Sequence, residues 1–109
     1  MVKYRDGERM LDALGLPLRR TMVRRLQQEG AMSLSKLAVP FKISLPAALK
    51  HIRLLEDSDI IETHKRGRVR ICVYKPSAFK ELGGWLASQS AFWESSFDRL
   101  GTIINKRKR

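Results

Sequence analysis

Apolar residues recur at helical spacing through the first part of the chain. Met10, Leu11 and Leu14 share one helical face and predict a short helix within residues 8–16. Proline is favoured at the first position of a helix and glycine just after its end, so a second helix should run from Pro17 to Gly30. Its predicted buried positions are Leu18, Met22, Val23 and Leu26. Its remaining surface carries four arginines, expected to be solvated or, as the alternative, to contact phosphate: Arg19, Arg20, Arg24 and Arg25.

Two further helices are each preceded by a serine that can cap the first turn. Ser33 should cap the first of them, and Pro40 limits it to little more than two turns. Its predicted buried positions are Leu34, Leu37, Ala38 and Phe41. After a turn at residues 42–43, Ser44 should cap the second helix, where Pro46 is tolerated because amides of the first turn lack helical partners. The predicted buried positions of this helix are Ala48, Ile52 and Leu55, and its opposite face carries Leu45, Leu49, Lys50 and Arg53.

A β-rich pattern follows at residues 60–64 and 69–74, and the turn around Gly67 between them predicts a hairpin. Alternation alone groups Val69, Ile71 and Val73 on one apolar face and turns Cys72 outward. Four cations lie at or near the hairpin tip, with no acid among them: Lys65, Arg66, Arg68 and Arg70. This concentration, directly after a basic helix, favours contact with phosphates or with a minor groove.

The last third of the chain predicts one long helix that begins at Ser77, a residue well suited to cap it. Its apolar stripe comprises Phe79, Leu82, Leu86, Trp93, Phe97, Leu100 and Ile104, with Trp85, Phe92 and Ile103 beside it. A helix continuous to Lys106 would be ~45 Å long, which is more than the rest of the domain can cover. A second copy of the chain is the simplest surface to bury it. Gly83 and Gly84 predict a kink or a close helix approach, and the tail at residues 106–109 is expected to be frayed.

Composition restricts the class of protein. The 109 residues suit one domain, and the formal net charge of +11 attracts polyanions in general. The chain lacks an apolar run of ~20 residues and a secretory signal, so we expect a cytoplasmic protein that makes no membrane contact. The sequence contains no Gly-rich phosphate loop, no His-rich metal spacing and no nucleophile with an evident base, so neither catalysis nor a cofactor is expected.

The order of the predicted elements is that of a winged helix-turn-helix, a mainly α fold with a small β-hairpin. We expect a core at residues 9–75, a C-terminal dimerisation helix at 77–105 and the basic tail at 106–109. The capped helix at Ser44 would read base edges in double-stranded DNA, and the hairpin, or wing, would contact phosphates. The candidate DNA-binding residues are Ser44, Leu45, Pro46, Ala47, Leu49, Lys50, His51, Arg53, Lys65, Arg66, Arg68 and Arg70. A winged helix that binds RNA or a protein is the alternative.

Three stretches resemble the ArsR family of bacterial winged-helix repressors: residues 14–20, residues 44–52 and the Gly67-Arg68 wing. The similarity covers roughly residues 9–105, and residues 37–41, 70–72, 85–86 and 92–94 resemble a non-metal subgroup of that family. The resemblance implies a homodimeric repressor that binds an inverted-repeat operator near its own promoter. It also implies that the first and last helices form the dimer interface through Leu11, Leu14, Leu82, Trp85, Leu86, Phe92, Trp93, Phe97, Leu100 and Ile104.

The chain departs from the pattern of the family's metal sensors. Their Cys-x-Cys pair corresponds to Ser33 and Ser35 here, and hydroxyls are poor ligands for soft metal ions. The family's C-terminal metal site needs several histidines and acids, whereas this chain has only His51 and His64. We therefore expect no metal site, and regulated release from DNA would need a small-molecule or protein effector.

Four side chains keep alternative interpretations. Leu49 stands where the family more often has a serine, and a leucine could contact a thymine methyl. His51, a usual histidine of the family, could contact a phosphate or pack inside the domain, and His64 is expected to be a surface residue. The resemblance directs Cys72 toward the core, which favours a buried inert thiol over a redox switch.

Overall fold

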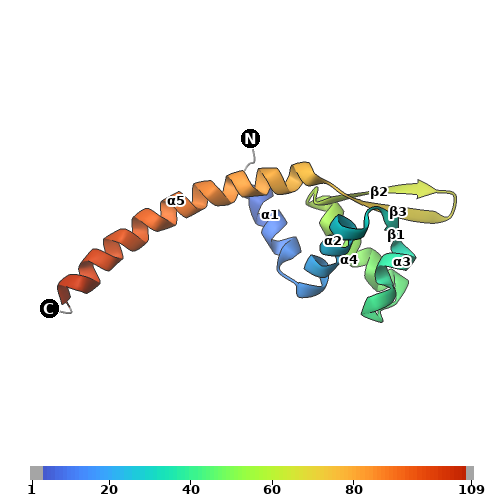
Figure 1. The fold of residues 1–109 in the computed structure, drawn as a ribbon, viewed down its shortest axis with the longest axis horizontal. Helices are drawn as coiled ribbons and strands as arrows, with labels where there is room; N and C mark the ends of the chain where they lie inside the picture. The colour runs from blue at the N-terminus through green and yellow to red at the C-terminus, as the bar shows by residue number, and fades with distance from the viewer. Residues whose placement is uncertain (1–3, 108–109) are drawn as a thin grey trace.

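The computed structural model describes the backbone of residues 4–107 and the side chains of residues 7–92. A body of short helices and a small sheet lies at one end of the molecule, and one long helix extends from it (Figure 1). The helices are α1 (Tyr4–Leu14), α2 (Pro17–Glu29), α3 (Leu34–Ala38), the 3-10 turn η1 (Val39–Phe41), α4 (Leu45–Asp57) and α5 (Pro76–Arg107), and the strands are β1 (Met32–Ser33), β2 (Ile61–Arg66) and β3 (Val69–Tyr74).

Two of the three predicted serine caps are confirmed, whereas α5 begins at Pro76 and Ser77 lies inside its first turn rather than before it. The Ser33 hydroxyl accepts a hydrogen bond from the Lys36 amide at 3.1 Å, and the Ser44 hydroxyl accepts one from the Ala47 amide at 3.2 Å. The helix after Ser33 is shorter than expected because Pro40 already belongs to the 3-10 turn. Lys42 then adopts the left-handed conformation, with φ of 53°, and redirects the chain into α4.

In the described residues the sheet has three antiparallel strands in the order β1-β3-β2. The hairpin pairs Ile61 with Tyr74 at its base and Arg66 with Val69 at its tip, and Gly67 at φ 60° makes the turn. The sequence analysis missed β1, which has two residues and pairs Met32 with Cys72. Two residues are too few to show a strand period, so β1 exists only through its pairing with β3.

Alternation alone was wrong about the direction of Cys72. Residues directly opposite in an antiparallel pair share a face, so Cys72 lies with Thr63 on the face toward the core and is fully buried. Val69 on the other face is 46% exposed, and Ile71 and Val73 are half-buried. The direction implied by the family resemblance is the one observed.

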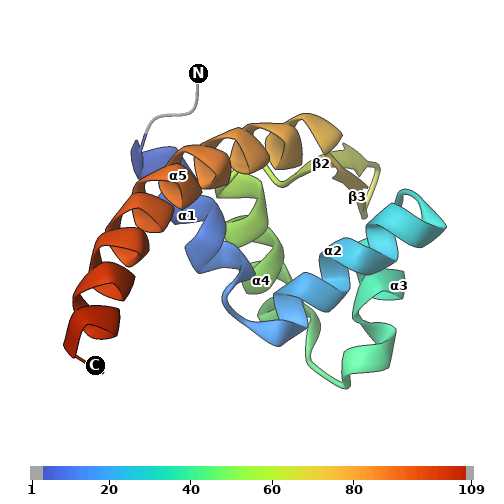
Figure 2. The same ribbon diagram turned by 60° about the vertical axis from the view of Figure 1, so that its left-hand side comes forward.

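The helical periodicities predicted the core well. Met22, Val23 and Leu26 of α2 and Ala48, Ile52 and Leu55 of α4 are all buried, as predicted. Figure 2 shows α2 crossing the body beside α4, with α1 between this pair and the long helix. Ala78 and Leu82 from the beginning of α5 also belong to the core, so α5 is anchored at one end only among the described side chains.

Helix α5 continues unbroken through Gly83 and Gly84 for 32 residues. Apart from the neighbouring residues and backbone of α5 itself, no described atom would lie within 4 Å of a Cβ on either glycine. These glycines therefore do not mark a close approach between two helices of the chain. Such an approach occurs at Gly7 of α1, where a Cβ would stand 2.6 Å from two atoms of the Trp85 indole. Gly7 therefore permits α1 and α5 to pack together (Figures 1 and 2).

The assignment of Leu82 to a dimer interface needs correction. Leu82 is 5% exposed and is buried in the core of its own chain, because the first turns of α5 cover the body. Leu14 is likewise packed against this core, whereas Leu11 and Leu86 are each 41% exposed. Four interface candidates, Trp93, Phe97, Leu100 and Ile104, have side chains outside the described residues, as does the tail at 106–109.

Candidate nucleic-acid interface

The outward face of α4 is mostly apolar at its beginning and basic further along. Leu45 is 50% exposed, Lys50 and Arg53 are exposed, and Leu49 is half-buried. A shallow groove of about 440 Å³ runs along this face, lined by Pro46, Leu49, Lys50, Arg53 and Leu54. The structure thus brings together, on one accessible helix face, the apolar and basic residues predicted to read DNA.

The wing carries its cations on both faces. Lys65 pairs with Arg70 across the hairpin, so these two side chains share the face that turns toward the helices. Arg66 pairs with Val69 and lies on the opposite face. Arg68 follows the turn at Gly67 and is exposed. The cations of the predicted basic wing therefore lie on both of its faces. The alternation of side chains along a strand already implies this.

A second groove, of about 510 Å³, joins the wing to the beginnings of α3 and α4. Its lining combines three cations, two serine hydroxyls and three apolar side chains: Lys65, Arg68, Arg70, Ser33, Ser35, Leu34, Leu45 and Val69. Three like charges facing one groove repel one another and favour an anionic occupant. The exposed Leu45 lies at the junction of this groove with the α4 face, so both basic elements border the same surface.

Arg70 is engaged inside the chain. Its Nη1 donates to the Thr63 hydroxyl at 2.9 Å, and that hydroxyl donates in turn to Glu56 Oε2 at 2.7 Å. The Thr63 amide also donates to Glu56 Oε2 at 3.1 Å. This chain of hydrogen bonds ties the base of the wing to the last turns of α4. Sequence reasoning missed Glu56 and Thr63, since no periodicity relates a helix residue to a strand residue.

His51 has an internal partner. Its Nδ1 lies 3.3 Å from Arg19 Nη1, and Arg19 also donates from Nε to the Ala13 carbonyl at 2.6 Å. Partial burial, Arg19 and Lys50 lower the pKa of His51, so the ring is neutral and Nδ1 can accept. These contacts favour packing inside the domain over phosphate contact. His64 is an exposed surface residue whose Nε2 lies 3.2 Å from Glu62 Oε1.

Arginines of α2 bind the carboxyl ends of neighbouring helices. Arg20 donates to the Leu14 carbonyl of α1 at 2.7 Å. Arg25 donates to the carbonyls of Lys36 and Leu37 in α3 at 3.0 and 2.9 Å. The last carbonyls of a helix lack helical partners, so these guanidinium groups satisfy them. The expectation of solvated side chains was therefore wrong for the partly buried Arg19 and Arg25, whereas Arg20 is exposed and also makes this one bond.

Cys72 and possible metal ligands are the remaining candidates from the sequence analysis. Burial raises the pKa of the Cys72 thiol to about 11, although Arg70 acts in the opposite direction. Cys72 is thus a buried thiol, as expected. Within the described part of the chain, no three His, Cys, Asp or Glu side chains cluster in a way that could hold a metal ion. The same part contains no helix long and apolar enough to span a membrane.

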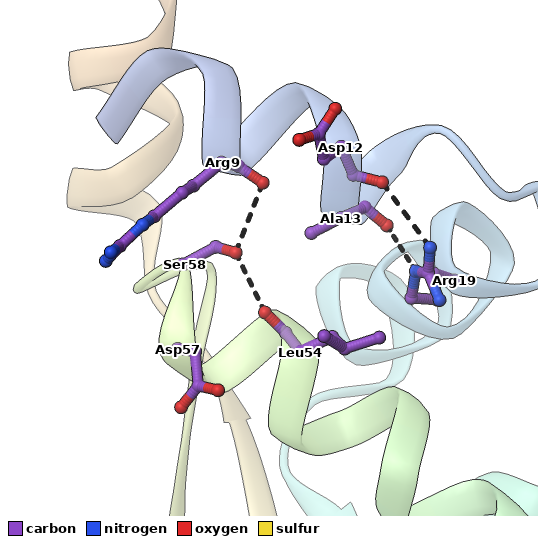
Figure 3. Close-up of a pocket in the computed structure, with 7 residues that line it drawn as sticks. All are labelled: Arg9, Asp12, Ala13, Arg19, Leu54, Asp57 and Ser58. Carbon is purple, nitrogen blue, oxygen red and sulfur yellow. Dashed lines mark hydrogen bonds between the residues drawn. The ribbon is translucent and has the colours of Figure 1, made fainter. Parts of the chain in front are cut away.

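A cavity of about 500 Å³ lies behind α4, between α1 and the carboxyl end of α4 (Figure 3). Its polar lining combines two arginines and two aspartates, Arg9, Arg19, Asp12 and Asp57, with the Ser58 hydroxyl. That hydroxyl lies 2.8 Å from the Leu54 carbonyl and 3.3 Å from the Arg9 carbonyl. The sequence carried no signal for this cavity because its lining comes from separate elements that only the fold brings together.

The comparisons with known proteins agree with this architecture. A family model for a helix-turn-helix domain matches residues 14–64. The crystal structure of an ArsR family transcriptional regulator is 43% identical, with 82% of this chain and 97% of that chain covered and a TM-score of 0.73. The crystal structure of a protein described as a possible transcriptional regulator for arsenical resistance is 30% identical, with 84% and 91% covered and a TM-score of 0.69.

An ArsR-like transcriptional regulator from Rhodococcus sp. RHA1 is 22% identical, with 92% and 93% covered and a TM-score of 0.73, and this likeness shows the fold alone. No curated protein matches the chain. The alignment with the 43% identical structure spans nearly all of that chain and most of this one. The chain therefore belongs to the ArsR family of transcriptional regulators, which implies that it binds DNA.

Proposed function

We propose that the protein is a homodimeric transcriptional repressor that binds an inverted-repeat operator with α4 in the major groove and the wing beside it. The observation that carries this proposal is the continuity between the exposed α4 face and the cationic groove at Leu45. A helix that enters a major groove needs phosphate contacts on both sides to fix its register. Arg53 on one side and Lys65 with Arg68 on the other supply cations at suitable places.

Dimerisation is supported by the part of the molecule that the body leaves uncovered. Leu11 of α1 and Leu86 of α5 are each 41% exposed, and Phe92 further along α5 is 60% exposed. Helix α5 extends well beyond the body (Figure 1), and its sequence continues with Trp93 and Phe97. Burying these two aromatic side chains against a partner would contribute ~2 to 3 kcal/mol each. A two-fold pairing of α1 and α5 would bury the exposed residues of both copies together.

A dimer would also give the geometry that operator recognition needs. Two recognition helices must be separated by about one turn of DNA, ~34 Å, to enter successive major grooves on one side of the duplex. An RNA-binding or protein-binding winged helix has no such requirement. Two identical DNA-binding helices related by two-fold symmetry would require an inverted repeat in the operator. Occupation of promoter DNA by this dimer would account for the repressor role.

Sedimentation and footprinting test the proposal together. The wild-type chain should sediment as a dimer at micromolar concentration and should protect a two-fold symmetric site in the DNA flanking its own gene. A duplex with one half-site is the control, and it should bind more weakly than the full site at equal salt. Trp93→Ala combined with Phe97→Ala should weaken the dimer or unfold the chain. A stable wild-type monomer, or a footprint without symmetry, would contradict the proposed dimer.

A further inference from the structure

The exposed side chains at the beginning of α4 are apolar and offer no hydrogen-bonding groups. Leu45 is half-exposed, Pro46 is exposed and Leu49 borders the groove along the helix. None of these three side chains can donate or accept a hydrogen bond. The helix does not need Leu45 for its core, which is built from Ala48, Ile52 and Leu55 on the opposite face.

The serine directly before Leu45 serves as the cap of α4. The Ser44 hydroxyl accepts from the Ala47 amide at 3.2 Å and thereby satisfies an amide of the first turn. An exposed leucine alone is ordinary on a protein surface, because much of any surface is apolar. The distinctive feature here is position. Leu45 borders the groove that holds Lys65 and Arg68, and Leu49 borders the one that holds Arg53.

Cations on both sides of an apolar strip match the cross-section of a DNA groove, where two phosphate backbones flank the base edges. If the cations contact phosphates, Leu45 and Leu49 face the base edges between them. The C5-methyl group of thymine is the apolar group on the major-groove edges of the four standard bases. A leucine placed against a polar edge would instead leave a donor or an acceptor without a partner.

We propose that Leu45 and Leu49 select operator positions by contact with pyrimidine C5-methyl groups, so that the positions facing the first half of α4 are thymines. This inference rests on the proposed function, since it requires α4 to lie in the major groove. It assigns the specificity of this part of the helix to apolar contact, and it leaves Lys50 and Arg53 to polar contacts further along.

Replacement of thymine by deoxyuridine tests the inference without changing the protein. Duplexes are first selected from a randomised pool with wild-type protein, and each thymine of the selected site is then replaced singly by deoxyuridine, which keeps base pairing and removes the methyl. Burial of one methyl group corresponds to about a fourfold change in affinity. We expect about this loss at one or two thymines in each half-site and no loss at thymines outside the protected region.

Two variants assign the effect to side chains. Leu45→Ala and Leu49→Ala should each remove the deoxyuridine penalty at the thymine that the residue contacts. Leu16→Ala is the matched control, because Leu16 is a 39% exposed leucine between α1 and α2 that lines neither groove, and it should keep the full penalty. A selected site with no deoxyuridine penalty, or a penalty unchanged in both variants, would overturn the inference and leave the proposed function standing. Failure to enrich any duplex from the pool would overturn both.

Discussion

At the scale of single residues, the contacts of a side chain decide what it does here more than its type. Arg70 and Arg68 are both wing arginines, yet Arg70 donates to Thr63 while Arg68 is exposed. Cys72 lies on the same strand as Arg70, but its side chain faces the core. Burial raises the pKa of the thiol, so it is protonated at neutral pH. His51 lies on α4, whose outward face is the proposed DNA-binding face, but its Nδ1 lies 3.3 Å from Arg19 Nη1 inside the chain.

The Cys72 thiol should react slowly with thiol reagents in the folded protein. Its pKa of about 11 leaves about one thiolate in a thousand at pH 8, and burial also denies access to the reagent. Ellman's reagent should therefore label the native chain far more slowly than the chain in denaturant, and Cys72→Ala should leave DNA affinity nearly unchanged. Labelling of the native protein at the rate of an exposed thiol would contradict the buried assignment.

His51 should make stability depend on pH just below neutrality. Its folded-state pKa is lower than the ordinary 6.5, so the unfolded chain binds more protons as the pH falls through this region. The free energy of unfolding should be highest above pH 6.5 and should fall as the pH drops through the folded-state pKa. The reason is that a protonated ring would be partly buried and would face Arg19 and Lys50. Urea denaturation between pH 7.5 and 5 measures this slope. His51→Gln should flatten it, and an equal slope in both proteins would refute the assignment.

At the scale of elements, two contacts decide how the parts of the body are joined. Gly7 allows α1 to approach the Trp85 indole on α5. Glu56 at the end of α4 holds Thr63 on β2, and Thr63 holds Arg70 on β3. The first contact connects the body to the long helix, and the second orients the wing relative to α4.

Gly7→Ala should destabilise the fold by ~1 to 3 kcal/mol, because the added methyl would overlap the Trp85 indole and force the two helices apart. Gly83→Ala is the control, since its Cβ would meet no described atom within 4 Å and alanine raises helix propensity by up to ~1 kcal/mol. Thermal or chemical denaturation compares the two variants with wild type. Equal stabilities for the Gly7 variant and wild type would show that α1 and α5 are not in this close contact.

The exposed wing arginines should act mainly through phosphates. Arg66→Ala combined with Arg68→Ala should weaken specific and nonspecific DNA alike and lower the slope of log affinity against log salt by roughly one to two ions per chain. Arg70→Ala is the matched comparison, and its cost should be mainly in stability, because it breaks the bond to Thr63. Changes at Leu45, Leu49 or Lys50 should instead penalise the operator by ~1 to 3 kcal/mol per lost contact. A salt slope left intact by the double arginine variant would contradict this division.

At the scale of the whole molecule, the chain is elongated, with principal extents of 67, 31 and 22 Å. Helix α5 causes this shape (Figure 1), because only its beginning packs on the body among the described side chains. In a lone chain, a helix that extends in this way would leave apolar side chains in contact with water, which is unfavourable. Its length and its exposed leucine and phenylalanine are what make a second copy the natural partner in the proposed dimer.

DNA binding by the whole protein should survive removal of metal ions. Ser33 is engaged as the cap of α3, and the described residues contain no cluster of three His, Cys, Asp or Glu side chains. Treatment with a chelator should leave operator affinity nearly unchanged in a mobility-shift assay, and release from DNA would then depend on another effector. A large loss with chelator that zinc restores would refute this expectation.

Local rules predicted most of the elements and the exposure of most candidate DNA-binding residues of α4. Ser33 and Ser44 mark helix starts by hydrogen bonds to their own first turns, and Pro17 marks one because its fixed φ suits the first helical position, so the sequence predicted those boundaries. The exposed positions of α4 followed from helical periodicity in the same way. The two-residue strand β1 and the direction of Cys72 did not, because both depend on pairing with a strand far away in the chain.

By itself, the sequence determined the order of the helices and of the two hairpin strands, the buried faces of α2 and α4 and the basic character of the wing. Each of these depends on residues within a few positions of one another. Only the tertiary structure decided that Arg19 bridges α1 to His51, that Arg70 holds Thr63 and that Leu82 belongs to the core. The physical reason is that these contacts join elements whose relative positions result from the packing of the whole core, and no local spacing records that packing.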